Sequence, residues 1–269
     1  MSRNEELAKG AAAAFRADHD LGSDGLGDLF TLLQATLGID VMSVAAEESV
    51  HGLTMLDPST GRIVIAVATT PHPMRQRSSV AHELGHVLLD HLLLDRPPVP
   101  GLRSPQEIQA DAFARHVLLP LESVKERVRP GVDVDGAVVS ALAQEFGVSA
   151  HIVAIQLREA SLIEESAVQG LKGLSAHALA VRYGWLDHHS SMARSSELPR
   201  APQRLIARAV RGVQEGVLGL PELARWYDRS VEELAADLVI GEEDGESADA
   251  PSWGIGEPLF EEPRQNGDE

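Results

Sequence analysis

Short apolar or alternating runs at 39–45, 52–56 and 62–68 predict strands. The turn sequence Asp57-Pro58-Ser59-Thr60-Gly61 separates the last two runs, so they are expected to pair within a small sheet of at least three strands. Apolar residues at helical spacing predict helices along most of the rest of the chain. The predicted helices are 4–17, 26–37, 74–91, one from Ser104 to Pro120, 134–146, 150–160, 202–214, 220–227 and 231–238.

This order of elements predicts an α+β fold, in which a small sheet packs on helices and a helical region follows. Changes in composition divide the chain into four parts. We expect an N-terminal helix and linker at 1–25, a mixed domain at 26–165, a helical module at 166–240 and an acidic tail at 241–269. The tail carries ten acidic residues against Arg264 alone, which predicts disorder.

The composition limits the chemistry that the chain can perform. Its 269 residues include no cysteine, which excludes disulfides and thiolate metal sites, so any metal is expected on His, Asp or Glu. The net charge of −18 is opposite in sign to the surface of a nucleic-acid-binding protein and disfavours direct DNA binding. Apolar stretches far shorter than the ~20 residues of a membrane span, and the lack of a secretory pattern in the first ten residues, predict a soluble, cytoplasmic protein.

The most informative motif is His82-Glu83-Leu84-Gly85-His86, within the predicted helix 74–91. Residues four apart share one face of a helix, so both imidazoles can reach the same cation while Glu83 lies near enough to hold a water beside it. This is the arrangement of zincin metallopeptidases. Core or helix-capping histidines beside a surface glutamate are the alternative interpretation.

Glu107 is the best candidate for the third protein ligand that a catalytic zinc usually needs. A metzincin would have glycine at 89 and histidine at 92, whereas this chain has Leu89 and Leu92. Glu107 and Asp111 share a face of the next helix, so Glu107 can bind metal while Asp111 hydrogen-bonds a ligand histidine. The alternative is a capping glutamate and an exposed aspartate. His91 is interpreted as an ordinary residue of the helix C-terminus, with a contact to a metal-ligating side chain as the alternative.

Three blocks of sequence closely resemble the ImmA/IrrE family of zinc metallopeptidases. The blocks are Arg77-Ser-Ser-Val-Ala-His-Glu-Leu-Gly-His-Val-Leu-Leu, Glu107-Ile-Gln-Ala-Asp-Ala-Phe-Ala and Leu118-Leu-Pro. They agree with the family in order and spacing, and the resemblance extends over about 26–163. The family often has asparagine where this chain has Asp111, a departure that is compatible with the same hydrogen-bonding role.

The resemblance implies a zincin-like fold for 26–165 and a gluzincin-like site, with His82, His86 and Glu107 as metal ligands and Glu83 as general base. Zinc is the metal expected for two histidines and one carboxylate, and manganese or iron suits the same geometry. Family members cleave a repressor of the helix-turn-helix Xre type, often encoded nearby, in response to DNA damage or another stress. The expected function is therefore a regulatory endopeptidase. The alternative is a non-catalytic zincin-fold module that sequesters a repressor or another partner protein.

Substrate is expected as an extended peptide paired with an edge strand at 62–69, which assigns Val64 and Val67 to the substrate-binding surface. A separate donor to the oxyanion is also expected. The sequence leaves four candidates for this donor: Arg77, His177, Tyr183 and His188.

The region after 165 predicts a helical module with a loop at His188 and His189. Residues 222–235 have the spacing of a degenerate helix-turn-helix, but carboxylates in its turn and second helix disfavour contact with phosphate. We therefore expect a role in sensing, dimerisation or repressor docking. Four arginines at helical spacing form a basic stripe that suits an acidic partner or the tail, with a solvated face as the alternative: Arg200, Arg204, Arg208 and Arg211.

Overall fold

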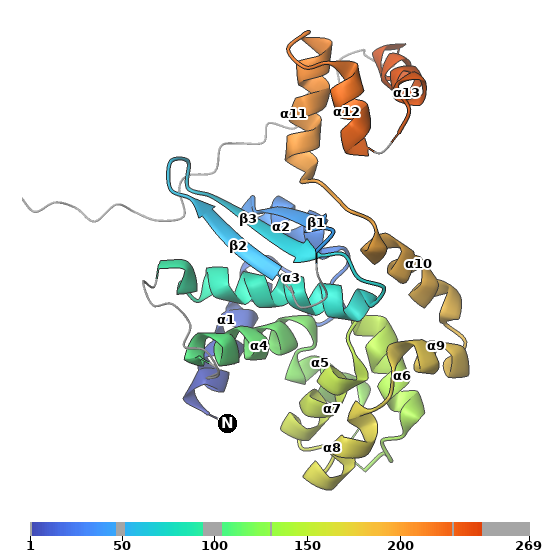
Figure 1. The fold of residues 1–269 in the computed structure, drawn as a ribbon. Helices are drawn as coiled ribbons and strands as arrows, with labels where there is room; N and C mark the ends of the chain where they lie inside the picture. The colour runs from blue at the N-terminus through green and yellow to red at the C-terminus, as the bar shows by residue number, and fades with distance from the viewer. Residues whose placement is uncertain (1, 47–51, 94–103, 130, 228, 244–269) are drawn as a thin grey trace, which may run out of the picture. The chain divides into compact units, whose positions relative to one another are not determined.

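The structure is a computed structural model that describes residues 2–46, 52–93, 104–129, 131–227 and 229–243 (Figure 1). These residues divide into two compact units, the first within 1–57 and 62–200 and the second within 58–61 and 201–269. Most of the predicted acidic tail, from residue 244 on, lies outside the described residues. The α+β fold class is confirmed, with one small sheet and a helical C-terminal region among the elements described.

The first unit begins with two helices whose ends follow from their capping residues. Helix α1 (Arg3–Asp18) starts after Ser2, which accepts a hydrogen bond from the backbone of Glu5. Helix α2 (Leu29–Leu37) starts after Asp28, three residues later than predicted, because the Asp28 carboxylate caps it. It ends at Gly38, whose φ of 64° suits glycine.

The sheet contains β1 (Asp40–Val44), β2 (Gly52–Asp57) and β3 (Arg62–Ala68) in the order β1-β3-β2. Strand β1 is parallel to β3, and β2 is antiparallel to it. The segment predicted as the edge strand is therefore central, and that prediction is wrong. Strand β3 pairs with another strand on each side. The alternation of buried residues along β3 reports which face of the strand is buried but not how many strands pair with it, so its own sequence does not reveal the central position.

The outer edges of β1 and β2 have different neighbours. Ser43 of β1 exchanges backbone hydrogen bonds with Arg200, at 2.9 and 3.0 Å, so the end of the first unit covers that side of β1. In the described part of the sheet, β2 is the other edge. Its Leu53 and Met55 side chains are 55% and 46% exposed.

A layer of helices lies against one face of the sheet (Figure 1). Helix α3 (Pro73–Leu88) packs on β2 and β3, and helix α4 (Pro105–Leu118) packs between α3 and α1. Gly85 permits the close approach of α3 and α4, because a Cβ at that position would lie 3.1 Å from the Cα of Ala110 and 3.2 Å from the ring of Phe113.

Helix α3 ends three residues before the predicted end at His91. Leu89 leaves the helical conformation, and Asp90 has a φ of 56°, a left-handed conformation that aspartate tolerates. The chain then forms the short 3-10 turn η1 (His91–Leu93). This reversal returns the His91 side chain toward α3, where its ring centroid lies 5.1 Å from that of His86.

The rest of the first unit is helical. It contains α5 (Leu121–Arg127), α6 (Gly136–Phe146), α7 (Ala150–Glu159), α8 (Glu165–Lys172), α9 (Ala176–Tyr183) and α10 (Leu186–Glu197). No single helix among the described residues has the length and apolarity to cross a membrane, although α6 and α7 meet that test as a pair bent by 106°.

Residues after 165 belong to the core of the first unit, whereas the sequence placed a domain boundary there. Leu171, Leu179 and Trp185 pack against the same apolar cluster as the sheet and α3. The Trp185 indole also donates to the Ser140 hydroxyl at 2.8 Å. The division into compact units falls after Arg200 instead, because these apolar contacts end there.

The loop predicted at His188 and His189 is wrong, because both residues lie in α10. His189 is buried against Trp185, with 5.8 Å between ring centroids, so packing stabilises a helix that its polar composition did not indicate.

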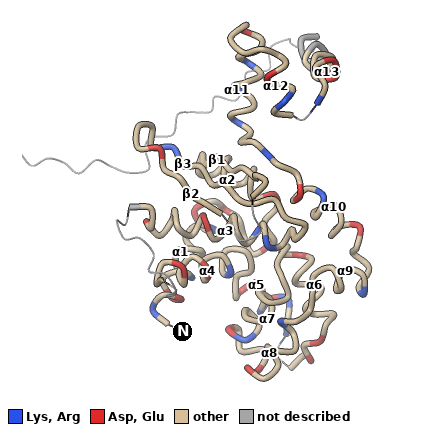
Figure 2. The backbone as a smooth tube through the Cα atoms, in the orientation of Figure 1, with Lys and Arg blue, Asp and Glu red and all other residues tan. Residues whose placement is uncertain are grey.

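The second unit contains α11 (Gln203–Gln214), α12 (Leu220–Tyr227) and α13 (Val231–Glu243). Ala209, Leu223, Ala224 and Leu234 form its small core. The charges are divided between these helices: α11 carries arginines and no acidic residue, whereas α13 carries acidic residues and no basic one (Figure 2). Arg200 is not part of the predicted basic stripe, because it precedes α11 and binds the Asp28 carboxylate at 2.9 Å in the first unit.

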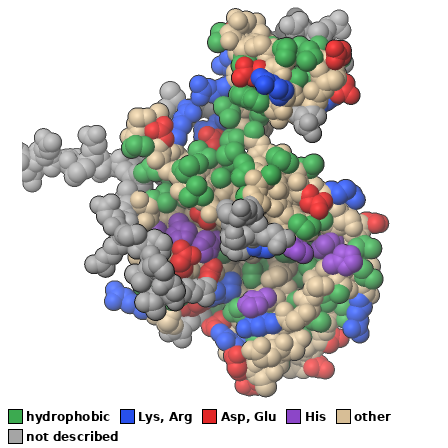
Figure 3. All heavy atoms as spheres, in the orientation of Figure 1, with side chains coloured by type: hydrophobic (Ala, Val, Ile, Leu, Met, Phe, Trp, Pro, Cys, Tyr) green, Lys and Arg blue, Asp and Glu red, His purple; other side chains and the backbone are tan. Residues whose placement is uncertain are grey.

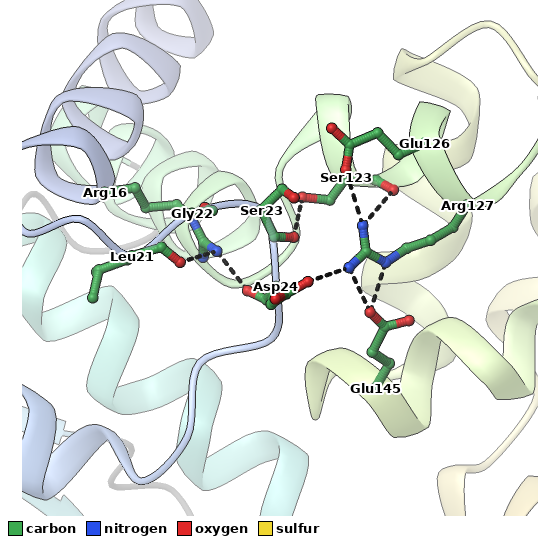
Figure 4. A network of polar contacts seen from close by, with 9 residues as sticks. All are labelled: Arg16, Leu21, Gly22, Ser23, Asp24, Ser123, Glu126, Arg127 and Glu145. Atoms are coloured by element: carbon green, nitrogen blue, oxygen red, sulfur yellow. Dashed lines mark hydrogen bonds and ion pairs between the residues drawn. The ribbon is translucent and has the colours of Figure 1, made fainter.

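A buried arginine joins α1 to the segment that follows it. Arg16, only 5% exposed, donates to the carbonyl oxygens of Val117 at 2.7 Å, Gly22 at 3.0 Å and Asp24 at 2.5 Å. The Asp24 carboxylate in turn binds Arg127 at 2.8 Å, as Figure 4 shows. Arg16 thus gives polar partners to backbone groups at the junction of three segments.

A second polar contact fixes the start of α1 on α4. The Glu5 carboxylate accepts hydrogen bonds from Arg115 at 2.8 Å and from His116 at 2.9 Å. The hydrogen bond from His116, with the charge of Arg115, lowers the pKa of the Glu5 carboxyl to about 2 against the opposing effect of burial. The ionised form of Glu5 therefore stabilises the folded state.

We expect Glu5→Gln to lower the free energy of unfolding at neutral pH by about 1–3 kcal/mol, since the hydrogen bonds to a charged group weaken. Because the folded-state pKa lies below the ordinary value of 4.5, the contribution of Glu5 is complete above 4.5 and is lost as the pH falls toward 2. Thermal unfolding of both proteins from pH 7 to pH 2 should show the difference narrowing. Glu6→Gln, at an exposed neighbour, is the matched control, and a pH-independent difference would contradict this account.

Candidate metal centre

Two histidines of α3 and one glutamate of α4 bring three metal-binding atoms together. His82 and His86 lie one turn apart on α3, with 3.1 Å between their Nε2 atoms. The Glu107 carboxylate approaches His82 Nε2 at 3.3 Å and His86 Nε2 at 3.4 Å. Among the described residues, this is the group of His, Asp and Glu side chains whose geometry suits a metal ion.

The contacts of His82 define which of its nitrogens carries the proton. Its Nδ1 lies 2.8 Å from the Asp111 carboxylate, which can only accept while it is ionised. Nδ1 is therefore the donor, and the Nε2 lone pair of the neutral ring points toward His86 and Glu107. Two lone pairs or carboxylate oxygens that converge at this distance repel each other unless a proton or a metal cation lies between them. The donor set thus fits a divalent metal.

His86 is held in the form that ligates metals. Burial lowers the pKa of His86 to about 4, and the charges of His82 and His91 add to this effect while Glu107 opposes it. The ring is therefore neutral at pH 7. His91 lies 3.0 Å from His86, between the two Nδ1 atoms. This contact agrees with the alternative interpretation of His91 rather than with that of an ordinary helix-terminal residue, because the chain reversal at Asp90 brings its ring back to α3.

Glu83 lies on α3 between the two histidines and faces strand β2. The Thr54 hydroxyl donates to Glu83 Oε2 at 2.7 Å, and a Cβ on Gly52 would lie 2.6 Å from Oε1. Burial raises the pKa of the Glu83 carboxyl above its usual value; Thr54 and the charge of His82 oppose the rise, and Glu107 adds to it. Glu83 is thus a buried carboxylate with one oxygen engaged by Thr54, an arrangement suited to accepting a proton.

Gly52 and Thr54 were not assigned to the site from the sequence, although the residue pattern of the strand contained one indication of their role. They alternate with the exposed Leu53 along β2, so both face the helix layer on which β2 packs. A glycine and a hydroxyl residue on the strand face opposite a buried glutamate indicate close approach and a hydrogen bond.

Neither valine assigned to substrate lies on a free strand edge. Val67 is 1% exposed and belongs to the core. Val64 is half-buried and pairs with Met55 across β2 and β3, so it lies on the opposite face of the sheet from Val67. The assignment of Val64 and Val67 as an edge-strand surface is corrected, because β3 is bonded to a strand on each side.

Two of the candidate oxyanion donors, Arg77 and His177, contact other parts of the first unit. The Arg77 guanidinium donates to the backbone oxygens of Leu26, Gly27 and Gly147 at 2.6, 2.7 and 3.1 Å, so it holds two loops together. His177 of α9 lies beside His189 of α10, with ring centroids 5.6 Å apart.

Histidine and acidic side chains gather below the sheet on the face shown in Figure 3. Within the metal-binding group, the side chains of His82 and His86 are 20% and 16% exposed and that of Glu107 is 46% exposed. The group is therefore accessible while its histidines remain largely desolvated.

Comparison with known proteins supports this description. Residues 34–158 match the family model described as the IrrE N-terminal-like domain, which belongs to a peptidase family. This segment is an IrrE N-terminal-like domain. The resemblance to the ImmA/IrrE family is therefore confirmed. A search of curated proteins finds no significant match to the chain.

The IrrE N-terminal-like domain spans the sheet, α3, α4 and the helices through most of α7. It includes all three members of the metal-binding group as well as Glu83 and Asp111. Helix α1 and the helices from α8 on lie outside the matched segment.

Proposed function

We propose that the chain is a regulatory zinc endopeptidase that cleaves a helix-turn-helix repressor of the Xre type and so relieves repression in a stress or mobile-element response. The observation that carries this proposal is the convergence of His82, His86 and Glu107 beside the buried Glu83 carboxylate. The match of residues 34–158 to a peptidase family supports hydrolysis, and the repressor is the substrate that the resemblance implies.

The distances within the group favour zinc as the metal. Two ligand atoms on a tetrahedral zinc ion, at bond lengths of about 2.0–2.1 Å, lie about 3.3 Å apart. The separations are 3.1 Å between the two Nε2 atoms, 3.3 Å from His82 Nε2 to Glu107 Oε2 and 3.4 Å from His86 Nε2 to Glu107 Oε1. Two histidines and a carboxylate, with the fourth position left for water or substrate, form a typical catalytic zinc site. Manganese and iron suit the same donors and are distinguished by metal analysis.

In this proposal the side chains of the domain divide the work of hydrolysis. Bound zinc would supply Lewis-acid polarisation of the peptide carbonyl and would acidify a water molecule. Glu83 is placed to accept one proton from the attacking water as the oxygen of that water bonds to the carbonyl carbon. When the C–N bond breaks, Glu83 returns the proton to the leaving amine, so one peptide bond and one water give a carboxylic acid and an amine. Thr54 orients Glu83 throughout.

Zinc content is the first prediction from this proposal. We expect one zinc per chain by native mass spectrometry, and we expect Glu107→Ala to lose it because one of three protein ligands is removed. Chelation should abolish peptide hydrolysis, and stoichiometric zinc should restore it. Glu122→Ala, at an exposed glutamate of α5, is the matched control. Hydrolysis by a metal-free chain would contradict the proposal.

Strand β2 is the best location for an extended substrate. No further described strand pairs with its outer edge, and Thr54 at its centre contacts Glu83. A peptide that adds to β2 by backbone pairing would pass beside the proposed general base. The alternating Leu53 and Met55 side chains would then flank substrate residues on the exposed face.

Lysines at Leu53 and Met55 are expected to raise the KM for a peptide substrate several-fold, because charged side chains discourage pairing at a sheet edge. Zinc content should not change, since neither residue contacts the metal-binding group. Val181→Lys, on α9, provides a control with the same 55% exposure as Leu53. Unchanged kinetics in the double variant would exclude this edge as the substrate site.

A further inference from the structure

A chain of hydrogen bonds runs from His86 to the N-terminal helix. His86 Nδ1 lies 3.0 Å from His91 Nδ1, and His91 Nε2 lies 2.9 Å from Gln109 Oε1. Gln109 Nε2 then donates to Asn4 Oδ1 at 3.0 Å. The four side chains come from α3, η1, α4 and α1.

The direction of donation along these hydrogen bonds follows from Asn4, at their far end. Asn4 Oδ1 can only accept, so Gln109 donates to it and turns its own Oε1 toward His91. That oxygen also only accepts, so His91 carries its proton on Nε2. In a neutral His91 ring the other nitrogen, Nδ1, is then a hydrogen-bond acceptor. His86 Nδ1–H therefore donates a hydrogen bond to His91 Nδ1. The Nε2 of His86 is left with its lone pair.

His91 thus has the same effect on His86 as Asp111 has on His82, because each accepts a hydrogen bond from Nδ1 of its histidine. In both ligands Nδ1–H is engaged, and both Nε2 lone pairs point to the space shared with Glu107. The reverse direction, with both amides turned over, would place a proton on His86 Nε2. That proton would point at His82, 3.1 Å away, and would block metal binding.

We infer that His91 is a positioning residue for the metal ligand His86, and that Gln109 and Asn4 anchor it. Asn4 lies outside the IrrE N-terminal-like domain, which begins at 34, so helix α1 contributes to the metal affinity of that domain. The glutamate next to Asn4 binds Arg115 and His116 of α4, which holds the start of α1 in place. This inference rests on the metal site of the proposed function but does not depend on hydrolysis.

The test measures zinc affinity of the full chain by competition with a chelator. We expect His91→Ala to bind zinc about 10- to 100-fold more weakly, the usual effect of losing the partner of a ligand histidine. His91→Gln, whose amide oxygen can accept from His86, should recover part of the loss. Asn4→Ala should weaken binding less than His91→Ala does, and Asn4→Asp, which keeps an oxygen acceptor, should bind as the parent chain does. His151→Ala, at an exposed histidine of α7, is the control.

Two further measurements separate positioning from a general folding defect. Thermal unfolding of the zinc-free variants should match that of the zinc-free parent within a few degrees. Nitrogen-15 spectra of the histidine rings should show His91 protonated on Nε2 in the zinc-loaded chain. Zinc affinity unchanged in His91→Ala, or a His91 proton on Nδ1, would overturn the inference. A parent chain that binds zinc with this ranking of variants yet cleaves no repressor would contradict the proposed function and support the inference.

Discussion

Glu83→Gln is expected to retain zinc and to slow peptide hydrolysis by about 10²- to 10⁴-fold, the usual contribution of a general acid–base group. Glutamine keeps the size of the side chain and can still accept a hydrogen bond from Thr54, which lies 2.7 Å from Glu83 Oε2 in the parent chain. It cannot take the proton of the attacking water. The loss should therefore appear in kcat, with KM nearly unchanged.

Two control measurements distinguish loss of the general base from the other effects of this substitution. Glu122→Gln, at an exposed position of α5, controls for the loss of one negative charge. Zinc content measured on the same samples separates loss of the base from loss of the metal. If Glu83→Gln relieves repression in cells as well as the parent chain does, the alternative holds, and the domain acts by sequestering its partner.

Arg16→Met is expected to lower the free energy of unfolding by about 3–5 kcal/mol. Methionine fills a similar volume but leaves the carbonyl oxygens of Val117, Gly22 and Asp24 without their donor. The contact to Val117 is buried, and a buried acceptor left unsatisfied costs about 1–3 kcal/mol. The contacts to Gly22 and Asp24 are part-buried, and the loss of these charge-assisted hydrogen bonds adds to the cost. The effect should be large although Arg16 lies outside the matched family segment.

Urea unfolding of the parent chain and Arg16→Met provides the measurement. Arg16→Lys should fall between them, because a single ammonium group cannot reach several carbonyls in the planar arrangement of a guanidinium. Arg3→Met, at an exposed arginine of the same helix, is the control. A loss below about 1 kcal/mol would show that the backbone at this junction finds other partners.

The positions of the strands were predictable from the sequence, but their order was not. Alternation of apolar residues located all three strands within one or two residues of their ends. The pairing of β1 with β3 depends on how the chain between them crosses the sheet, and no local pattern records that path. This is why Val64 and Val67 were assigned to an edge. Likewise, the start of α10 is held by contacts with other elements, because His189 packs on His177 of α9 and Trp185 donates to Ser140 of α6, and the composition of α10 did not indicate them.

The metal-binding group was predictable as a set of candidates because its members repeat at helical spacing within two segments. His82 and His86 share one helix face, and Glu107 and Asp111 share another. The residues that support them carry no such signal. Thr54 reaches Glu83 across 29 positions of sequence, and Gln109 meets Asn4 across 105. Such contacts arise only from the tertiary fold.

Metal-dependent cleavage of a defined peptide bond is the central claim, and intact-mass analysis tests it most directly. A helix-turn-helix repressor of the Xre type, the substrate class of the proposed function, would be incubated with the zinc-loaded chain, with the chelated chain and with Glu83→Gln. The account predicts two fragments with the zinc-loaded parent alone, whose masses sum to that of the repressor plus one water. An uncut repressor in stable complex with both the parent and Glu83→Gln would contradict it.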